Sequence, residues 1–253
     1  MTVAQIYEKL SQRIPEHLRE EWDNDGLMCA SDDSIEVKRT LITLDITEEV
    51  VDYAVANDFD LIVSHHPLIF RPLKAVVEDD HVARKVIKLI KNDVAVISLH
   101  TRADKVEGGV NDTLCEILGI RDTQPFGEGF IGRIGVLDEE LYMEDFSYLL
   151  KGLLNADGVK VADALIPVQR VAVVGGDGKD FVEDALRLGA DTFVSGRISY
   201  NIMAEANEMG INLIEAGHFF TEHPVTSFFQ SLLMRYDSEM YVEILDSNAI
   251  KLI

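Results

Sequence analysis

The sequence predicts an α/β protein made of two similar lobes, and three observations support this prediction. Strand-like apolar runs recur along the chain, amphipathic helical stretches separate them, and part of the first half aligns with part of the second. The chain has 253 residues, of which 47% are hydrophobic and 27% charged, so it can bury a large core without disulfides or a structural metal. We expect parallel sheets that are covered by helices.

The expected strands are short apolar runs that follow one another along the chain. They span residues 39–45, 60–64, 94–100, 130–137, 170–176, 191–195, 211–218 and 240–245. Stretches with helical periodicity, such as TEEVVDYAVAND and GKDFVEDALRLG, lie between consecutive runs. This alternation is typical of parallel strands joined by helices.

An internal repeat is predicted by comparing the chain with itself. Residues 39–66 align without a gap with residues 170–197, and both segments read as strand, helix and strand. The next strand ends in HTRAD in the first copy and in HFFTE in the second, so both place an acidic residue four positions after a histidine. We therefore expect one lobe over residues 1–126 and another over 127–253, with the terminal segments packing across this boundary.

Charge and cysteine content restrict the partners and the compartment. The chain has 23 Lys and Arg residues against 45 Asp and Glu residues, a net charge of −22. This charge disfavours anionic membranes and DNA, although a locally basic surface would admit DNA. Cys29 and Cys115 form neither a disulfide framework nor a zinc pattern, and the first residues contain no signal peptide or membrane span. We expect a cytoplasmic protein with no membrane partner.

Side chains that bind metals follow three of the predicted strands. They are His65 with His66, His100 with Asp104, and His218 with Glu222. The carboxyl ends of parallel strands meet at one edge of a sheet, where α/β proteins bind their ligands. The sequence therefore predicts a metal site.

The spacing of these residues suggests two ions. Adjacent residues in an extended chain point in opposite directions, so we expect His65 and His66 to bind one each of two neighbouring ions. His218 and Glu222 share one face of a helix, and Glu222 can bridge both ions while Asp104 completes the second. Nitrogen and carboxylate donors suit Zn, Mn, Fe, Co or Ni. Two such ions would lower the pKa of bound water toward neutrality and support hydrolysis.

Several other residues are candidates for supporting roles. His100 is expected to be a metal ligand, a proton shuttle or a support for a ligand. Arg197 ends a predicted strand and either contacts a substrate phosphate or forms a surface ion pair. Asp45 supports a ligand or caps a helix, residues 22–24 form a turn, and GGDGK at 175–179 forms a simple turn or contacts a phosphate.

The succession of motifs resembles a known family. WDNDGL, DLIVSHHPLIF, HTRAD, GGVND and GHFFTEHP occur in this order, and the chain is similar over almost its whole length to the NIF-three-like family, also catalogued as GTP cyclohydrolase I type two homologues. The resemblance implies two α/β lobes with a dinuclear metal site in the cleft between them. By resemblance, His65, Asp104 and Glu222 would bind one ion, and His66, His218 and Glu222 the other.

The same resemblance implies an assembly and a candidate reaction. Family members of this length look like ring-shaped homohexamers, built as trimers of dimers, with metal sites that open toward the central cavity. The implied reaction opens the imidazole ring of GTP and releases formate, with His100 moving a proton. This chain has SGRISYN where the family commonly has TGE and a histidine, and HTRAD where it has HTxLD, so the substrate contacts near Arg197 and Tyr200 depart from the family pattern.

We expect a dinuclear metal-dependent hydrolase that acts on a small nucleotide-like substrate. Two alternative functions remain open. The first is another metal-assisted hydrolysis, of phosphoesters or damaged nucleotides. The second is a metal-binding scaffold or chaperone without turnover.

Overall fold

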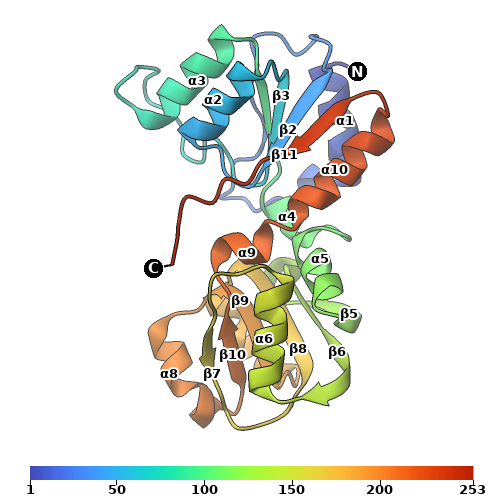
Figure 1. The fold of residues 1–253 in the computed structure, drawn as a ribbon, viewed down its shortest axis with the longest axis vertical. Coiled ribbons are helices and arrows are strands. Elements are labelled where there is room, and N and C mark those ends of the chain that lie inside the picture. The colour runs from blue at the N-terminus through green and yellow to red at the C-terminus, as the bar shows by residue number, and fades with distance from the viewer. Residues whose placement is uncertain (253) are drawn as a thin grey trace. The chain divides into compact units, whose positions relative to one another are not determined.

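The chain folds into two compact units in a computed structural model that describes residues 1–252 (Figure 1). The first unit comprises Met1–Val106 with Val225–Ala249, and the second comprises Glu107–Pro224 with residues 250–252. This division differs from the expected lobes 1–126 and 127–253. The C-terminal strand pairs within the first sheet, so it packs across the expected boundary, whereas the strand at Arg121–Phe126 pairs within the second sheet and lies outside the lobe expected for it.

The first unit is built on a five-stranded sheet with the order β1-β4-β3-β2-β11. Its elements are α1 (Val3–Arg13), the 3₁₀ turn η1 (Glu16–Leu18), β1 (Gly26–Cys29), β2 (Arg39–Thr43), α2 (Glu48–Ala56), β3 (Leu61–Ser64), α3 (His81–Lys91), β4 (Ala95–Ser98), α4 (Thr101–Lys105), α10 (Val225–Tyr236) and β11 (Tyr241–Ile244). Strands β4, β3, β2 and β11 are parallel, and β1 joins the edge antiparallel.

Helices cover both faces of the first sheet, because the central strands are apolar on both faces. Figure 1 shows α2 and α3 on one side and α1 and α10 on the other. Leu41, Ile62 and Val96, one from each central strand, pack in the core cluster that includes residues of α2 and α3. Successive side chains of a strand point to opposite faces, so the fully buried neighbours of these residues face the other helix layer.

The second unit contains a six-stranded sheet with the order β5-β6-β8-β9-β10-β7. Its elements are α5 (Val110–Ile117), β5 (Arg121–Phe126), η2 (Glu128–Phe130), β6 (Gly132–Leu141), α6 (Met143–Leu153), β7 (Lys160–Ala162), β8 (Val168–Asp177), η3 (Lys179–Phe181), α7 (Val182–Arg187), β9 (Thr192–Arg197), α8 (Tyr200–Met209), β10 (Asn212–Glu215) and α9 (His218–Glu222). Strands β8, β9 and β10 are parallel, whereas β5, β6 and β7 are antiparallel to their neighbours.

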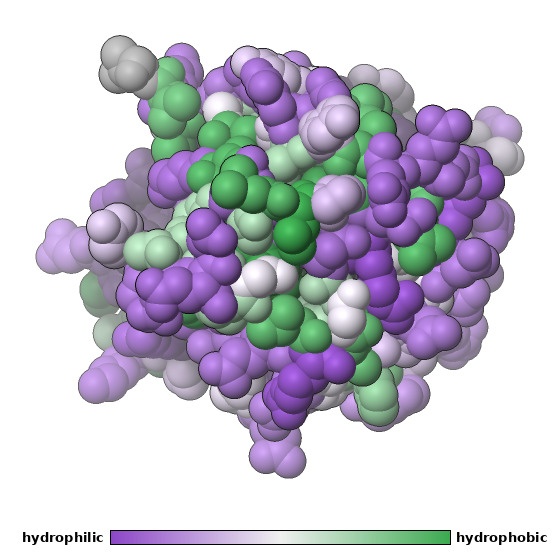
Figure 2. All heavy atoms as spheres, turned by 90° about the horizontal axis from the view of Figure 1, so that it is seen from below, coloured by the Kyte–Doolittle hydropathy of each residue, from purple (hydrophilic) through white to green (hydrophobic). Residues whose placement is uncertain are grey.

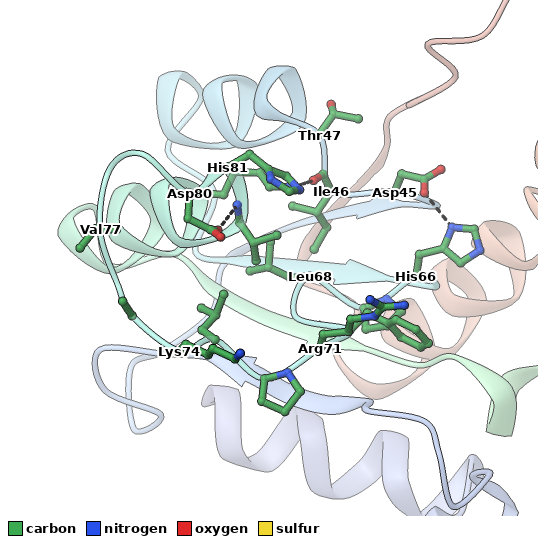
Figure 3. A pocket seen from close by; sticks show the side chains of 17 residues that line it. Asp45, Ile46, Thr47, His66, Leu68, Arg71, Lys74, Val77, Asp80 and His81 are labelled. Carbon is green, nitrogen blue, oxygen red and sulfur yellow. Dashed lines mark hydrogen bonds and ion pairs between the residues drawn. The ribbon is translucent and has the colours of Figure 1, made fainter.

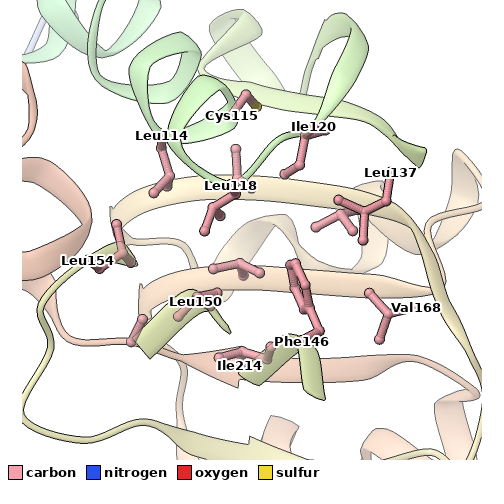
Figure 4. Close-up of a cluster of buried hydrophobic side chains, with 14 of the residues drawn as sticks. Leu114, Cys115, Leu118, Ile120, Leu137, Phe146, Leu150, Leu154, Val168 and Ile214 are labelled. Carbon is pink, nitrogen blue, oxygen red and sulfur yellow. The ribbon is translucent and has the colours of Figure 1, made fainter. Parts of the chain in front are cut away.

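Alternate residues of β8 enter two different cores in the second unit. Val171 and Val173 pack against α5 and α6 in the cluster of Figure 4, where Phe146 is fully buried. Ala172 and Val174 point to the other face and pack with residues of α7 and α8. The strand is therefore buried on both faces, which explains its uninterrupted apolar sequence.

The mixed α/β fold with two sheets agrees with the predicted fold class, and each predicted apolar run contains a strand. The two segments that align in sequence form β2-α2-β3 and β8-α7-β9, but the internal repeat itself stays a prediction. Within residues 1–252, no helix combines the length and the apolar composition needed to cross a bilayer.

Candidate metal centre

Three histidines of the first unit form a compact cluster at the ends of β3 and β4. The ring centroids of His65 and His66 lie 5.0 Å apart, and His100 lies 5.3 Å from the first and 5.6 Å from the second. Each histidine offers a ring nitrogen within 4.8 Å of the others, close enough to hold a metal ion. His65 is buried, whereas His66 and His100 are partly exposed, so the cluster is accessible from one side.

The two adjacent histidines lie side by side, and not on opposite faces of an extended chain as expected. Strand β3 ends at Ser64, and the hydroxyl of Ser64 donates a hydrogen bond to the carbonyl of His66 at 2.8 Å. This contact bends the backbone at His65 and His66. Both rings therefore belong to one cluster, which allows them to bind one ion or two neighbouring ions.

Each histidine of the cluster has its Nδ1 atom at an oxygen acceptor. Nδ1 of His65 lies 3.0 Å from the carbonyl of Leu99, that of His66 lies 2.7 Å from Oδ1 of Asp45, and that of His100 lies 2.8 Å from Oδ1 of Asp23. Because these acceptors require Nδ1–H, the neutral rings carry their lone pairs on Nε2. An oxygen acceptor on the second nitrogen is the usual support of a metal-binding histidine.

Asp104 adds a carboxylate to this cluster. Its Oδ1 atom lies 3.5 Å from Nε2 of His65. Two ligand atoms that bind one tetrahedral ion at about 2.1 Å lie about 3.4 Å apart, so this separation fits a shared ion. The donor set of imidazole nitrogens with a buried carboxylate is therefore compatible with a divalent transition metal.

Two aspartates of the 22–25 segment hold the His100 region in place. Asp23 accepts a hydrogen bond from His100. It also accepts from the backbone N–H of Thr101 at 3.1 Å and from the Thr101 hydroxyl at 2.6 Å. Burial alone would raise the pKa of Asp23, but the hydrogen bonds from His100 and Thr101 outweigh it and lower the pKa to about 2. Asp23 thus remains a carboxylate that fixes the orientation of His100.

Asp25 anchors the helix that carries Asp104. Its Oδ2 atom accepts from Nε of Arg102 at 2.9 Å and from the backbone N–H of His100 at 3.1 Å, and both side chains of this ion pair are fully buried. Arg102 also donates to the carbonyl of Ile14 at 3.1 Å. Burial raises the pKa of Asp25, whereas the neighbouring Arg102 lowers it.

The second unit carries its own pair of ligand-type side chains on α9. Nε2 of His218 lies 2.9 Å from Oε2 of Glu222, four residues later on the same helix face, and Glu222 is buried while His218 is half-exposed. Gly176 of β8 has a φ of +70°, and a Cβ atom there would collide with the Glu222 carboxylate. The backbone N–H of Gly176 also donates to the hydroxyl of Thr221 at 3.1 Å. The glycine therefore allows α9 to pack closely on the sheet.

The remaining candidates of the second unit lie at the surface. Arg197 ends β9 with an exposed side chain whose Nη1 atom lies 3.9 Å from Oδ2 of Asp177, a weak ion pair. Tyr200 begins α8 and is 87% exposed. In the GGDGK segment, Gly175 and Gly176 belong to β8 and the next α-helix has only six residues, so the close packing of α9 explains these glycines better than a phosphate site does.

Sequence reasoning located the histidines and offered Asp45 as the support of a ligand, but it missed the role of Asp23. The interpretation of residues 22–24 as a plain turn overlooked Asp23, which lies 77 positions from its partner His100 in sequence. The two readings of Asp45 are resolved, because it supports His66 and the hydroxyl of Thr47 caps α2 instead. The two acidic residues of the WDND motif were the available indication.

Comparisons with known proteins agree over nearly the whole chain. The sequence model of the family described as Duf34/NIF3 (NGG1p interacting factor 3) matches residues 1–251. A protein of Clostridium perfringens named GTP cyclohydrolase 1 type 2 homolog is 39% identical over 89% of this chain and 88% of its own length. A protein of the same name from Clostridium acetobutylicum is 33% identical over 83% and 81%, respectively. The crystal structure of a hypothetical protein from Staphylococcus aureus, 25% identical, superposes with a TM-score of 0.89 over 100% of this chain and 99% of that chain.

Proposed function

The chain belongs to the Duf34/NIF3 family, and from this premise we propose that it is a dinuclear metal-dependent hydrolase that acts on a nucleotide, with GTP as the candidate substrate. The observation that carries the proposal is the cluster of His65, His66 and His100, each with its Nδ1 atom on an oxygen acceptor. This arrangement presents three Nε2 lone pairs to one region, as a metal centre requires. The choice of GTP rests on the names of the relatives.

Five residues are proposed as the ligands of the two ions. His65 and Asp104 would bind the first, His66 and His218 the second, and Glu222 would bind both. The separation of His65 and Asp104 and the pairing of His218 with Glu222 support this assignment within each unit. The ligands are nitrogens and carboxylate oxygens without thiolate, which suits Zn, Mn, Fe, Co or Ni.

His100 is proposed to move a proton during hydrolysis. Bound divalent ions supply Lewis acidity, which activates water and polarises the carbon that is attacked. The lone pair of His100 lies on Nε2, which can accept a proton, and the carboxylate of Asp23 at Nδ1 stabilises the resulting imidazolium. For GTP, the reaction opens the imidazole ring of guanine and releases formate.

A combined metal and product assay tests this function. Purified protein loaded separately with Zn, Mn, Fe, Co or Ni is expected to release formate from GTP, and His100→Gln is expected to lower the rate by about 100-fold or more while retaining metal. Lys38→Ala, which removes an exposed surface lysine, serves as the control. Absence of formate under every metal, with metal still bound, would refute the cyclohydrolase activity and favour another hydrolysis or a metal-binding scaffold.

Self-association into a homohexamer is the second part of the proposal. In the second unit, helix α6 and the residue that precedes it carry exposed apolar or aromatic side chains. They are Tyr142, Tyr148, Leu149 and Leu153. Hydrophobic residues also gather near the centre of the face in Figure 2, with hydrophilic residues around them. Exposed apolar groups of this kind are typical of protein interfaces. Sedimentation equilibrium tests the assembly, and a monomer at micromolar concentration would contradict it.

A further inference from the structure

A cavity of about 910 Å³ opens beside His66 in the first unit (Figure 3). The loop that leads from His66 to α3 forms much of its wall, and Asp45, Ile46 and Thr47 line another part. In Figure 3, His66 and Asp45 stand at one end and Val77 at the other. Its volume lies within the range of small-molecule sites, and its end at His66 adjoins the candidate metal centre.

The cavity lining carries a small excess of positive charge in a strongly acidic protein. Arg71, Lys74 and Lys85 line it, against the two carboxylates of Asp45 and Asp80. Both carboxylates already accept hydrogen bonds, Asp45 from His66, and Asp80 from the first backbone N–H groups of α3 at 2.8 and 2.9 Å.

The cations themselves are arranged for an anion. Within residues 1–252, neither Arg71 nor Lys74 forms an ion pair, and both side chains are exposed. Lys85 is half-buried, and its ammonium donates to the carbonyl of Ile46 at 2.5 Å, which holds it against the cavity wall. A chain with a net charge of −22 therefore presents a local excess of cations next to His66. Phosphate groups are the natural ligands of such a site.

Two exposed aromatic rings lie beside the histidine cluster, and one of them also lines the cavity. Phe70 lines the cavity, and its ring centroid lies 6.1 Å from that of His100. Trp22 contacts Phe70 edge-on at 6.2 Å and lies 6.3 Å from His100. The exposed fractions are 63% for Trp22 and 44% for Phe70, so both rings offer surface for stacking on a planar base.

We propose that this cavity binds the phosphate chain of a nucleoside triphosphate through Arg71 and Lys74, while the base stacks against Phe70 and Trp22 beside His100. The inference rests on the proposed function and specifies its substrate contacts. It assigns the phosphates to the first unit, in place of Arg197, which was the candidate from the sequence. Lys85 adds a third positive charge at the wall.

The only tryptophan of the chain, Trp22, provides the assay. Quenching of its fluorescence on titration of the metal-loaded, full-length protein measures binding of GTP and of guanosine, which lacks the phosphates. We expect GTP to bind at least tenfold more tightly than guanosine. Arg71→Ala/Lys74→Ala should remove this preference and leave guanosine binding unchanged, whereas Phe70→Ala should weaken both ligands about tenfold.

Two control variants test whether the effect on GTP binding is specific to the cations that line the cavity. Lys88→Ala/Lys91→Ala removes two exposed lysines of α3 that do not line the cavity, and Arg197→Ala removes the other candidate. Neither is expected to change the dissociation constant for GTP. The proposal is overturned if the Arg71/Lys74 double variant binds GTP as tightly as the unsubstituted protein, or if Arg197→Ala removes the preference for GTP instead.

Formate release, measured in parallel, distinguishes the failure of this inference from failure of the proposed function. Binding that depends on Arg71 and Lys74, without formate release, would retain the nucleotide site and reject the cyclohydrolase reaction. Formate release with an unchanged KM in the double variant would retain the reaction and reject the site. If both hold, the double variant should raise KM by about tenfold with little change in kcat.

Discussion

Replacing Asp45 with asparagine tests whether this carboxylate supports a metal-binding histidine. Asp45 accepts a hydrogen bond from Nδ1 of His66 at 2.7 Å, so the substitution removes a negative charge at nearly constant volume. Loss of a carboxylate that accepts a hydrogen bond from a metal-binding histidine typically lowers metal affinity by 10- to 100-fold. The Asp45 side chain is 43% exposed, so solvent screens part of its field, and we expect a value near the lower limit. The predicted loss is about tenfold, or about 1.4 kcal/mol.

Competition for Zn²⁺ with a chromophoric chelator measures this loss directly. Asp52→Asn is the matched control, because Asp52 lies on α2 and forms an exposed ion pair with Lys88. Both substitutions should change the free energy of unfolding of the metal-free protein by less than about 1 kcal/mol, so a difference between them reports metal binding and not folding. The reasoning is refuted if Asp45→Asn binds Zn²⁺ as tightly as the control while His66→Ala has lost it.

Three further predictions concern folding and packing. Arg102→Met should lower the free energy of unfolding by about 3–5 kcal/mol, because it removes the buried cation of the Asp25 carboxylate and leaves only the longer contact with the partly exposed Arg19 at 3.6 Å. Burial raises the pKa of Asp25, and loss of Arg102 would raise it further, so chemical denaturation should show a larger deficit at pH 8 than at pH 4. Gly176→Ala should weaken Zn²⁺ binding and cost about 1–2 kcal/mol, since it strains a residue with a φ of +70° and displaces Glu222. Cys29 and Cys115 should resist alkylation at pH 8 until the chain unfolds, because burial raises the pKa of both thiols to about 12.

Each of these predictions has an outcome that contradicts it. An equal deficit of Arg102→Met at both pH values would show that loss of Arg102 does not raise the pKa of Asp25. Unchanged Zn²⁺ affinity in Gly176→Ala would mean that the Glu222 carboxylate is not a ligand. Labelling of both thiols in native protein, detected as a mass increase by mass spectrometry, would show that the two cysteines are not buried.

The central strands were predictable because burial leaves a direct trace in sequence. Strands β2, β3, β4, β8, β9 and β10 are apolar on both faces and appear as uninterrupted runs. Strand β5 was missed because nearly all its side chains are exposed, so its pairing with β6 depends on a neighbour and not on its own pattern. The C-terminal segment was expected to pack across the lobe boundary, but the pairing of β11 with β2 was not predicted, since a strand's sequence does not identify its partner.

The histidines of the candidate site were predictable from the sequence, but their orientation and their carboxylate partners were only partly so. His65, His66 and His100 were found because the ends of parallel strands converge at one edge of a sheet. Their relative orientation was not, because it depends on the bend that the Ser64 hydroxyl makes after β3. The role of Asp23 was not predictable either, because its contact with His100 joins distant parts of the chain.

Anomalous X-ray diffraction from crystals of the Zn²⁺-loaded protein shows whether the histidine cluster binds two ions. We expect two Zn²⁺ peaks at the cluster, one about 2.1 Å from Nε2 of His65 and the other about 2.1 Å from Nε2 of His66. A map in which Zn²⁺ occupies only surface sites, with no peak at either Nε2 atom, would contradict this prediction.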